Sequence, residues 1–128
     1  DLTGIEGQAA NVSELGDLQL TEGVTEAMIN AYRMASGDDN LVHVDQAVAR
    51  SLGLRDRILH GMRTDHLAER ALLHGGVERP VHRIGHSRTE FLGVVYPGDT
   101  LRAFRAGDPG IGVVTVVNQN DRIVLIRR

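Results

Sequence analysis

The chain has 128 residues, which is enough for one domain with a hydrophobic core and too few for two ordinary domains. Its formal net charge of -3 provides no field that would attract nucleic acid or an anionic membrane surface. The sequence contains no cysteine, which excludes a disulfide framework and a thiol nucleophile, and no apolar run approaches the ~20 residues of a membrane span. We therefore expect a cytoplasmic protein with no nucleic-acid partner and no membrane partner.

The first part of the chain is rich in Gly, Ala, Asn and Ser and shows no clear periodicity. Residues 1–16 are therefore predicted to be an extended or partly ordered arm, and residues 17–128 a single domain. A period-two pattern of apolar residues that begins at Leu18 predicts a strand. Thr25 then offers an N-cap, and apolar residues at helical spacing predict a helix that Gly37 ends.

The rest of the chain changes from helical to β patterns. A short helix over 45–51 and a longer helix over 61 to about 74 are predicted next. The strands that follow are predicted over residues 81–91, 100–106, 111–118 and 122–127, with the clearest hairpin turn at 118–121. Together with the strand at Leu18, these runs predict about five mostly antiparallel strands around one long helix, which is an α+β class.

An acid and an imidazole, Asp38 and His43, lie five positions apart in a stretch that its composition predicts to be a turn. Gly37 permits the positive φ of a sharp turn, and Asp and Asn favour turns through side-chain bonds to nearby backbone. Histidine titrates near neutral pH, so a His and a carboxylate together can act as general acid and base on one water molecule. Taken alone, the pair favours the simpler interpretation, an Asx turn beside a surface histidine.

Three motifs occur in order along the chain. They are Tyr32 with Ser36-Gly37-Asp38-x-Asn40-x-x-His43, then Ile58-x-His60-Gly61-Met62, and then Val95-Tyr96-Pro97-Gly98-Asp99-Thr100-Leu101. In combination they resemble the signature of the MaoC-like, R-specific enoyl-CoA hydratase family, over about residues 17 to 127. This resemblance implies a hot-dog fold, in which an antiparallel sheet wraps around a long central helix.

The resemblance also implies roles for individual residues. Asp38 and His43 would activate water for addition to a trans-2-enoyl thioester, giving an (R)-3-hydroxyacyl thioester, with Asn40 in a supporting role. Gly61 would donate its N–H to the thioester carbonyl oxygen, although a plain helix N-cap explains this glycine equally well from the sequence alone. The residues implied to contact the substrate are Ser36, Gly37, His60 and Met62.

Members of the family use no metal or redox cofactor, take an acyl-CoA or acyl-carrier-protein thioester as substrate, and usually form homodimers, so we expect the same here. On the predicted strand, His82 and His86 would lie about 13 Å apart, too far for one zinc ion. Two alternatives stay open. One is a specialised, polyketide-like dehydratase acting on carrier-bound substrates, and the other is a non-catalytic subunit that binds acyl thioesters.

Two features depart from the family pattern. Leu41 stands where the family commonly has Pro, which would make the approach to His43 less rigid. The long helix also carries four charged residues, and burying unpaired charge is costly. These residues are Arg63, Asp65, Glu69 and Arg70. We expect them to face solvent or a partner subunit, or to pair with one another.

Overall fold

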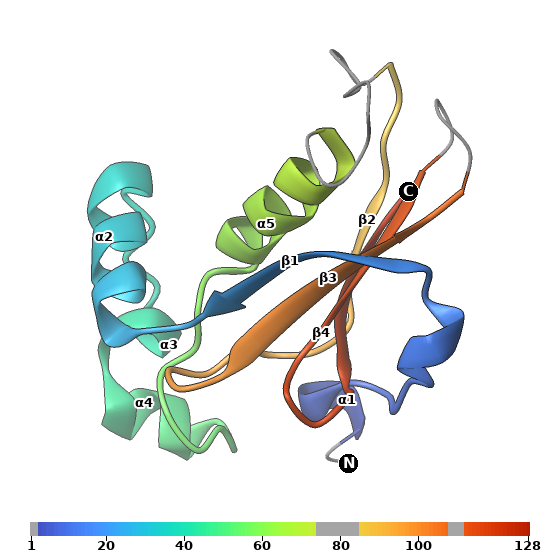
Figure 1. The fold of residues 1–128 in the computed structure, drawn as a ribbon. Helices are drawn as coiled ribbons and strands as arrows, with labels where there is room; N and C mark the ends of the chain where they lie inside the picture. The colour runs from blue at the N-terminus through green and yellow to red at the C-terminus, as the bar shows by residue number, and fades with distance from the viewer. Residues whose placement is uncertain (1–2, 74–84, 108–111) are drawn as a thin grey trace.

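The computed structural model describes residues 3–73, 85–107 and 112–128. Within these residues the strands form one antiparallel sheet in the order β1-β3-β4-β5-β2 (Figure 1). The strands are β1 (Asp17–Gly23), β2 (Thr89–Phe91), β3 (Thr100–Ala106), β4 (Val113–Val117) and β5 (Ile123–Arg127). Helix α5 (Gly61–Leu73) lies along this sheet, so the predicted α+β arrangement of sheet and long helix is confirmed.

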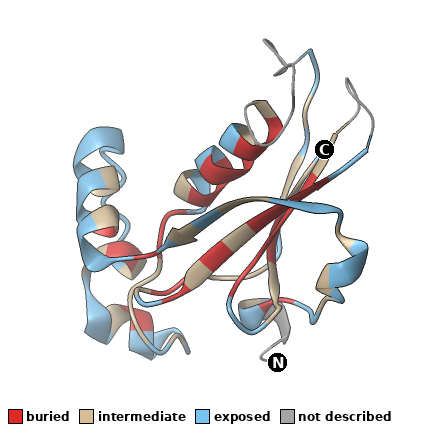
Figure 2. Ribbon diagram, viewed as in Figure 1, coloured by how far each residue is buried: buried red, intermediate tan, exposed pale blue. Residues whose placement is uncertain are grey.

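The core lies between α5 and the sheet (Figure 2). Leu67, Ala68 and Ala71 form the buried face of the helix, at the spacing predicted by the periodicity. They pack on alternate residues of the central strands, including Leu101 and Val116. Helix α5 contacts β1, β3, β4 and β5, so its position is fixed across most of the sheet.

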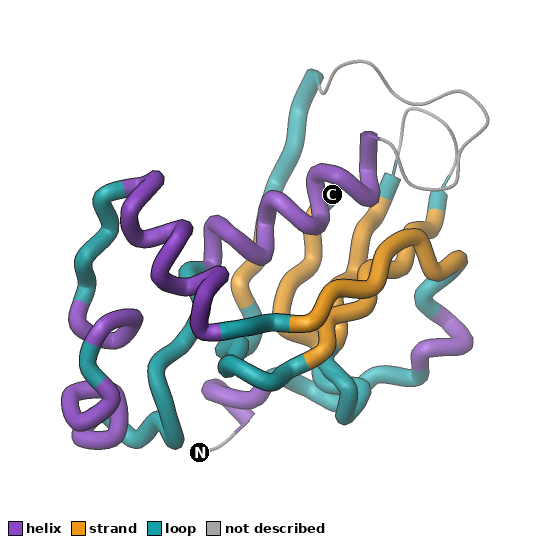
Figure 3. Tube along the Cα trace, turned by 60° about the vertical axis from the view of Figure 1, so that its left-hand side comes forward, coloured by secondary structure: helices purple, strands orange, loops and turns teal. Residues whose placement is uncertain are grey.

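Three further helices lie together beyond the end of β1, beside the sheet (Figure 3). They are α2 (Glu26–Ser36), α3 (Leu41–Val44) and α4 (Gln46–Ser51). The Thr25 hydroxyl accepts a hydrogen bond from the Met28 N–H at 3.2 Å, which confirms the predicted N-cap. Gly37 ends α2 in the left-handed conformation, with φ of 74°. Helix α3 was not predicted, because four residues are too few to show a helical period.

Several predicted boundaries differ from the structure. A strand was expected over 81–91, and within its described part Thr89–Phe91 forms a strand while residues 85–88 are irregular. Residues 81–84 lie outside the described residues, and so does the predicted helix end at His74. The hairpin turn at 118–121 is confirmed by a hydrogen bond from the Asp121 N–H to the Asn118 carbonyl at 3.1 Å. Its left-handed Asp121, with φ of 57°, suits such a turn.

The N-terminal arm has more structure than its composition indicated. It contains helix α1 (Thr3–Glu6) and a 3-10 turn, η1 (Val12–Glu14). The Val94 N–H donates to the Ile5 carbonyl at 2.7 Å, and Ala9 forms an isolated antiparallel bridge with Arg122. Backbone bonds to the rest of the chain therefore hold the arm, which local composition does not reveal.

The charged residues of α5 do not pair with one another. Arg63 and Arg70 both approach Glu22 of β1, at 3.0 and 3.1 Å. On the other side of the helix, Asp65 pairs with Arg127 of β5 at 3.2 Å, and Glu69 also approaches Arg127, at 3.6 Å. Asp65 is buried, contrary to the expected solvent-facing position, because the arginine of the sheet compensates its charge.

Candidate active site

The turn between α2 and α3 is built by side chains that bond to their own neighbourhood. The Asp38 N–H donates to the Ser36 hydroxyl at 3.1 Å, and the Asn40 N–H donates to Asp38 Oδ1 at 3.1 Å. Asn40 in turn caps α3, because its Oδ1 accepts from the Val42 N–H at 3.3 Å. These bonds use one oxygen of the Asp38 carboxylate and leave Oδ2 available.

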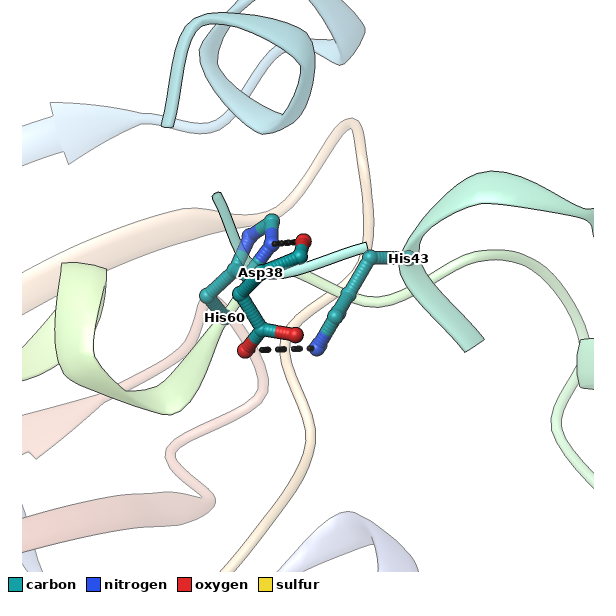
Figure 4. Close-up of side chains that lie close together, drawn as sticks. All are labelled: Asp38, His43 and His60. Carbon is teal, nitrogen blue, oxygen red and sulfur yellow. Dashed lines mark hydrogen bonds and ion pairs between the residues drawn. The ribbon is translucent and has the colours of Figure 1, made fainter. Parts of the chain in front are cut away.

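His43 lies on α3 and turns its ring into the protein, where it is 8% exposed. Its Nδ1 is 2.8 Å from the Ile58 carbonyl oxygen. Since a carbonyl can only accept, Nδ1 carries the proton of the neutral ring and Nε2 has a free lone pair. That Nε2 faces Asp38 Oδ2 at 3.9 Å, a separation that one water molecule can bridge (Figure 4).

The surroundings of His43 favour its neutral form. Burial lowers the pKa of the His43 imidazole below its ordinary value, and the neighbouring His60 lowers it further. The hydrogen bond to the Ile58 carbonyl and the charge of Asp38 act in the opposite direction on this pKa but do not outweigh burial. His43 is therefore available as a proton acceptor below the pH at which an exposed histidine would be.

His60 packs directly against His43. The two rings are stacked, with centroids 3.8 Å apart and planes inclined by 22°. The Nε2 of His60 is 3.0 Å from the main-chain oxygen of Asp38, and the centroids of the His60 and Tyr32 rings are 4.9 Å apart. With 2% exposure, His60 is enclosed by protein rather than open to a ligand.

Gly61 begins α5 immediately after His60. Among the described residues no oxygen accepts a hydrogen bond from its N–H, as is usual for the first N–H groups of a helix. A Cβ at this position would lie 3.0 Å from the ring of Phe91 on β2. Phe91 and Met62 are both about half exposed, so apolar side chains border the start of the helix.

The structure brings together Asp38, His43 and His60, whose potential ligand atoms lie within 4.8 Å of one another. All three were predicted as site residues, with His60 as a substrate contact, but the convergence of their ligand atoms was not predicted. The distance argument against a metal concerned His82 and His86, and His82 lies outside the described residues. The two rings are stacked, so their lone pairs do not converge on one point, and Nε2 of His60 is engaged by a carbonyl. The arrangement suits proton transfer on water better than metal coordination.

The third motif, at residues 95–101, forms a turn whose contacts hold the segment that carries His60. The turn at 95–101 is closed by a bond from the Tyr96 N–H to the buried Asp99 carboxylate at 2.9 Å. The Leu59 N–H donates to the Val95 carbonyl at 2.8 Å, which ties this turn to the segment that carries His60. Sequence reasoning missed two neighbours of the site, the Ile58 carbonyl and Phe91, because neither has a chemical signature in the sequence.

Comparison with known proteins gives a consistent result. A family model described as MaoC like domain matches residues 10–107. The chain is 34% identical over 96 residues to the peroxisomal hydratase-dehydrogenase-epimerase of Saccharomyces cerevisiae, a match covering 74% of this chain and 10% of that protein. It is 27% identical over 111 residues to the enoyl-CoA hydratase ChsH3 of Mycobacterium tuberculosis, covering 85% and 38% respectively. The chain spans less than two fifths of the length of the curated relatives it matches.

Solved structures share the fold. The R-hydratase PhaJ1 of Pseudomonas aeruginosa superposes with a TM-score of 0.71 at 24% identity, covering 89% of this chain and 77% of that one. This similarity confirms the predicted hot-dog fold. Within the described residues, no helix combines the length and the apolar character needed to cross a membrane.

Proposed function

Because the chain belongs to the family of MaoC-like domains, we propose that it is a hydro-lyase that interconverts trans-2-enoyl thioesters and (R)-3-hydroxyacyl thioesters. The observation that carries this proposal is the pairing of His43 Nε2 with Asp38 Oδ2 at 3.9 Å. Both atoms are available, since the local turn bonds use the other carboxylate oxygen and the Ile58 carbonyl engages the other ring nitrogen. A water molecule between them would face a base and an acceptor at once.

In the hydration direction, His43 Nε2 takes a proton from this water while its oxygen bonds to the β-carbon of the enoyl thioester. Negative charge then develops on the thioester carbonyl oxygen, where the Gly61 N–H, which has no acceptor among the described residues, can stabilise it. The pair of Asp38 and His43, called the dyad below, returns one proton to the α-carbon. The elements of one water molecule are thereby added across the double bond. Asn40 supports this geometry by capping the short helix that carries His43.

The substrate carrier and the assembly are part of the same proposal. We expect an acyl-CoA or acyl-carrier-protein thioester, since both present the same reacting atoms. We also expect a homodimer, for which β2 offers the second edge of the described sheet, with Phe91 half exposed on it. Sedimentation at several concentrations measures the assembly independently of activity.

The test of this function is turnover on crotonyl-CoA and on a panel of carrier-bound enoyl thioesters. Asp38→Asn and His43→Ala should each lower turnover by at least ~10²-fold, the usual contribution of a positioned acid or base. The double variant should lose little more than either single one, because both residues act on one water.

Asp39→Asn is the matched control. This neighbouring carboxylate is exposed and pairs with Arg33 at 2.7 Å, so its loss should change turnover by less than about twofold. Nearly unchanged hydration by Asp38→Asn would remove the proposed dyad, and no hydration by the wild-type chain on any member of the panel would remove the function.

A further inference from the structure

His60 is placed to act on both members of the dyad without reaching the substrate. Its Nε2 meets the Asp38 main-chain oxygen at 3.0 Å, and its ring face covers the ring of His43 at 3.8 Å. At 2% exposure, it has no surface left for an acyl thioester. Its location therefore differs from the substrate contact that the family resemblance implied.

The hydrogen-bonding atoms of His60 define its tautomer. The Asp38 oxygen can only accept, so Nε2 must donate and carries the proton of the neutral ring. Nδ1 is buried and meets no partner among the described residues, which agrees with an unprotonated nitrogen at that position. His43 has the opposite tautomer, with its proton on Nδ1 toward Ile58. Both stacked rings thus present Nε2 to Asp38, and this nitrogen is protonated in His60 and unprotonated in His43.

We propose that His60 is a positioning residue that holds the Asp38 main chain and the plane of the His43 ring so that Oδ2 and Nε2 face the same water. This proposal rests on the proposed hydratase function. The need for such a residue follows from the turn itself, because the Asp38 side chain is 52% exposed and its other bonds reach only residues two positions away. A displacement of about 1 Å can cost a large factor in rate, so a buried anchor for this turn has a direct kinetic effect.

Two variants separate the two contacts of His60. His60→Gln keeps an N–H that can reach the Asp38 oxygen but lacks the aromatic face, whereas His60→Phe keeps the face and lacks the donor. Each should lower kcat by about tenfold or more with KM changed by less than about twofold, because positioning acts on the reacting groups and not on substrate binding. His66→Phe is the matched control. The His66 ring also lies beside Tyr32, with centroids 5.9 Å apart, but His66 is exposed and makes no hydrogen bond or ring contact with Asp38 or His43. The kcat of this variant should stay within about twofold of the wild type.

A general packing defect would lower kcat in any background, whereas a positioning role depends on the dyad. In an Asp38→Asn background, His60→Phe should therefore reduce the residual rate by less than about twofold. An undiminished tenfold loss in that background would overturn the proposal. A wild-type kcat in both His60 variants would overturn it as well.

Nitrogen NMR of the wild-type imidazoles, assigned with the His43→Ala and His60→Gln variants, tests the arrangement without any substrate. We expect His60 protonated on Nε2 and His43 protonated on Nδ1 at a pH where both rings are neutral. The reverse tautomer of His60 would overturn the proposal even if neither variant folds. Absence of wild-type turnover on the thioester panel together with the expected tautomers would instead reject the hydratase function and leave the hydrogen-bonded arrangement intact.

Discussion

The turn at residues 36–45 and the helix α5 hold their polar side chains in opposite ways. In the turn, Ser36, Asp38 and Asn40 each accept from a backbone N–H two residues away, and most of these groups are exposed. On α5, the charged side chains pair with Glu22 and Arg127, residues that belong to the two ends of the chain. The local sequence determines the bonds of the turn, whereas the ion pairs of α5 form only when segments distant in the sequence pack together.

This difference separates function from stability. Local bonds shape the turn and still leave Asp38 Oδ2 free for chemistry, so changes there should affect turnover more than folding. The ion pairs of α5 join the helix to strands β1 and β5, so changes there should affect folding more than turnover.

Asp65→Ala should give the largest loss of stability. It removes the partner of Arg127 at 3.2 Å and the acceptor of the Thr89 hydroxyl at 2.8 Å, both partly buried. We expect the free energy of unfolding to fall by about 2–3 kcal/mol, less than for a fully isolated charge because Glu69 still approaches Arg127. Urea denaturation measures this, and activity per folded molecule should be preserved.

Arg70→Ala is the control for that change, since Arg70 is 54% exposed and Glu22 retains Arg63. Arg70→Ala should lower the free energy of unfolding by less than about 1 kcal/mol. Equal losses in the two variants would break the comparison between buried and exposed pairs of α5.

Gly61→Ala should lower activity by about tenfold while changing stability by less than about 1 kcal/mol. The added Cβ would meet the Phe91 ring at 3.0 Å, and the half-exposed ring can yield by a few tenths of an ångström. The methyl group would then stand beside the N–H that we assign to the thioester oxygen. Kinetics on crotonyl-CoA beside thermal denaturation would separate the two effects, and full activity would place the thioester elsewhere.

The pH dependence should follow His43. Because burial lowers its pKa in the folded chain, the folded state binds fewer protons than the unfolded state below the ordinary pKa of histidine, 6.5. This group therefore destabilises the fold as pH falls from 6.5 toward the folded-state pKa, and has no further effect at lower pH. Urea titrations across this pH window measure the free energy of unfolding, which should depend less on pH in His43→Ala than in the wild type. In a separate measurement, kcat/KM of the wild type should persist below pH 6.5.

Leu41→Pro should have the smallest effect. Leu41 is the first residue of α3, where Pro is favoured, and Asn40 before it is outside the helical region, with φ of -53° and ψ of 129°. Among the described residues nothing accepts from the Leu41 N–H, so Pro removes no hydrogen bond. We expect unchanged kcat and a stability gain of at most about 1 kcal/mol, seen as a slightly higher Tm. A lower kcat would show that the turn needs more freedom than the structure indicates.

The same contrast explains what could be predicted from the sequence. The N-cap at Thr25, the stop at Gly37 and the start of α5 at Gly61 depend on neighbouring residues, and they were predicted correctly. Helix α3 was not predicted, because four residues show no periodicity. The partners of the α5 charges were not predicted either, because they depend on the order of the strands in the sheet.

Within the site, the pair of Asp38 and His43 was predicted from the resemblance of three motifs to a known family, since their spacing alone favours an Asx turn beside a surface histidine. The stacking of His60 on His43 could not be predicted, because it depends on the Ile58 carbonyl and on the connection of Leu59 to Val95. A motif identifies the residues that do chemistry, but not the direction in which a buried ring points.

The pairing of β1 with β3 joins residues 17–23 to residues 100–105, and everything between them forms one long closed loop of chain. Closing such a loop is entropically unfavourable and slow compared with forming the hairpin from β4 to β5. The turn with Asp38, the segment with His60 and α5 all lie inside this loop. During refolding the hairpin should therefore form before β1 pairs with β3.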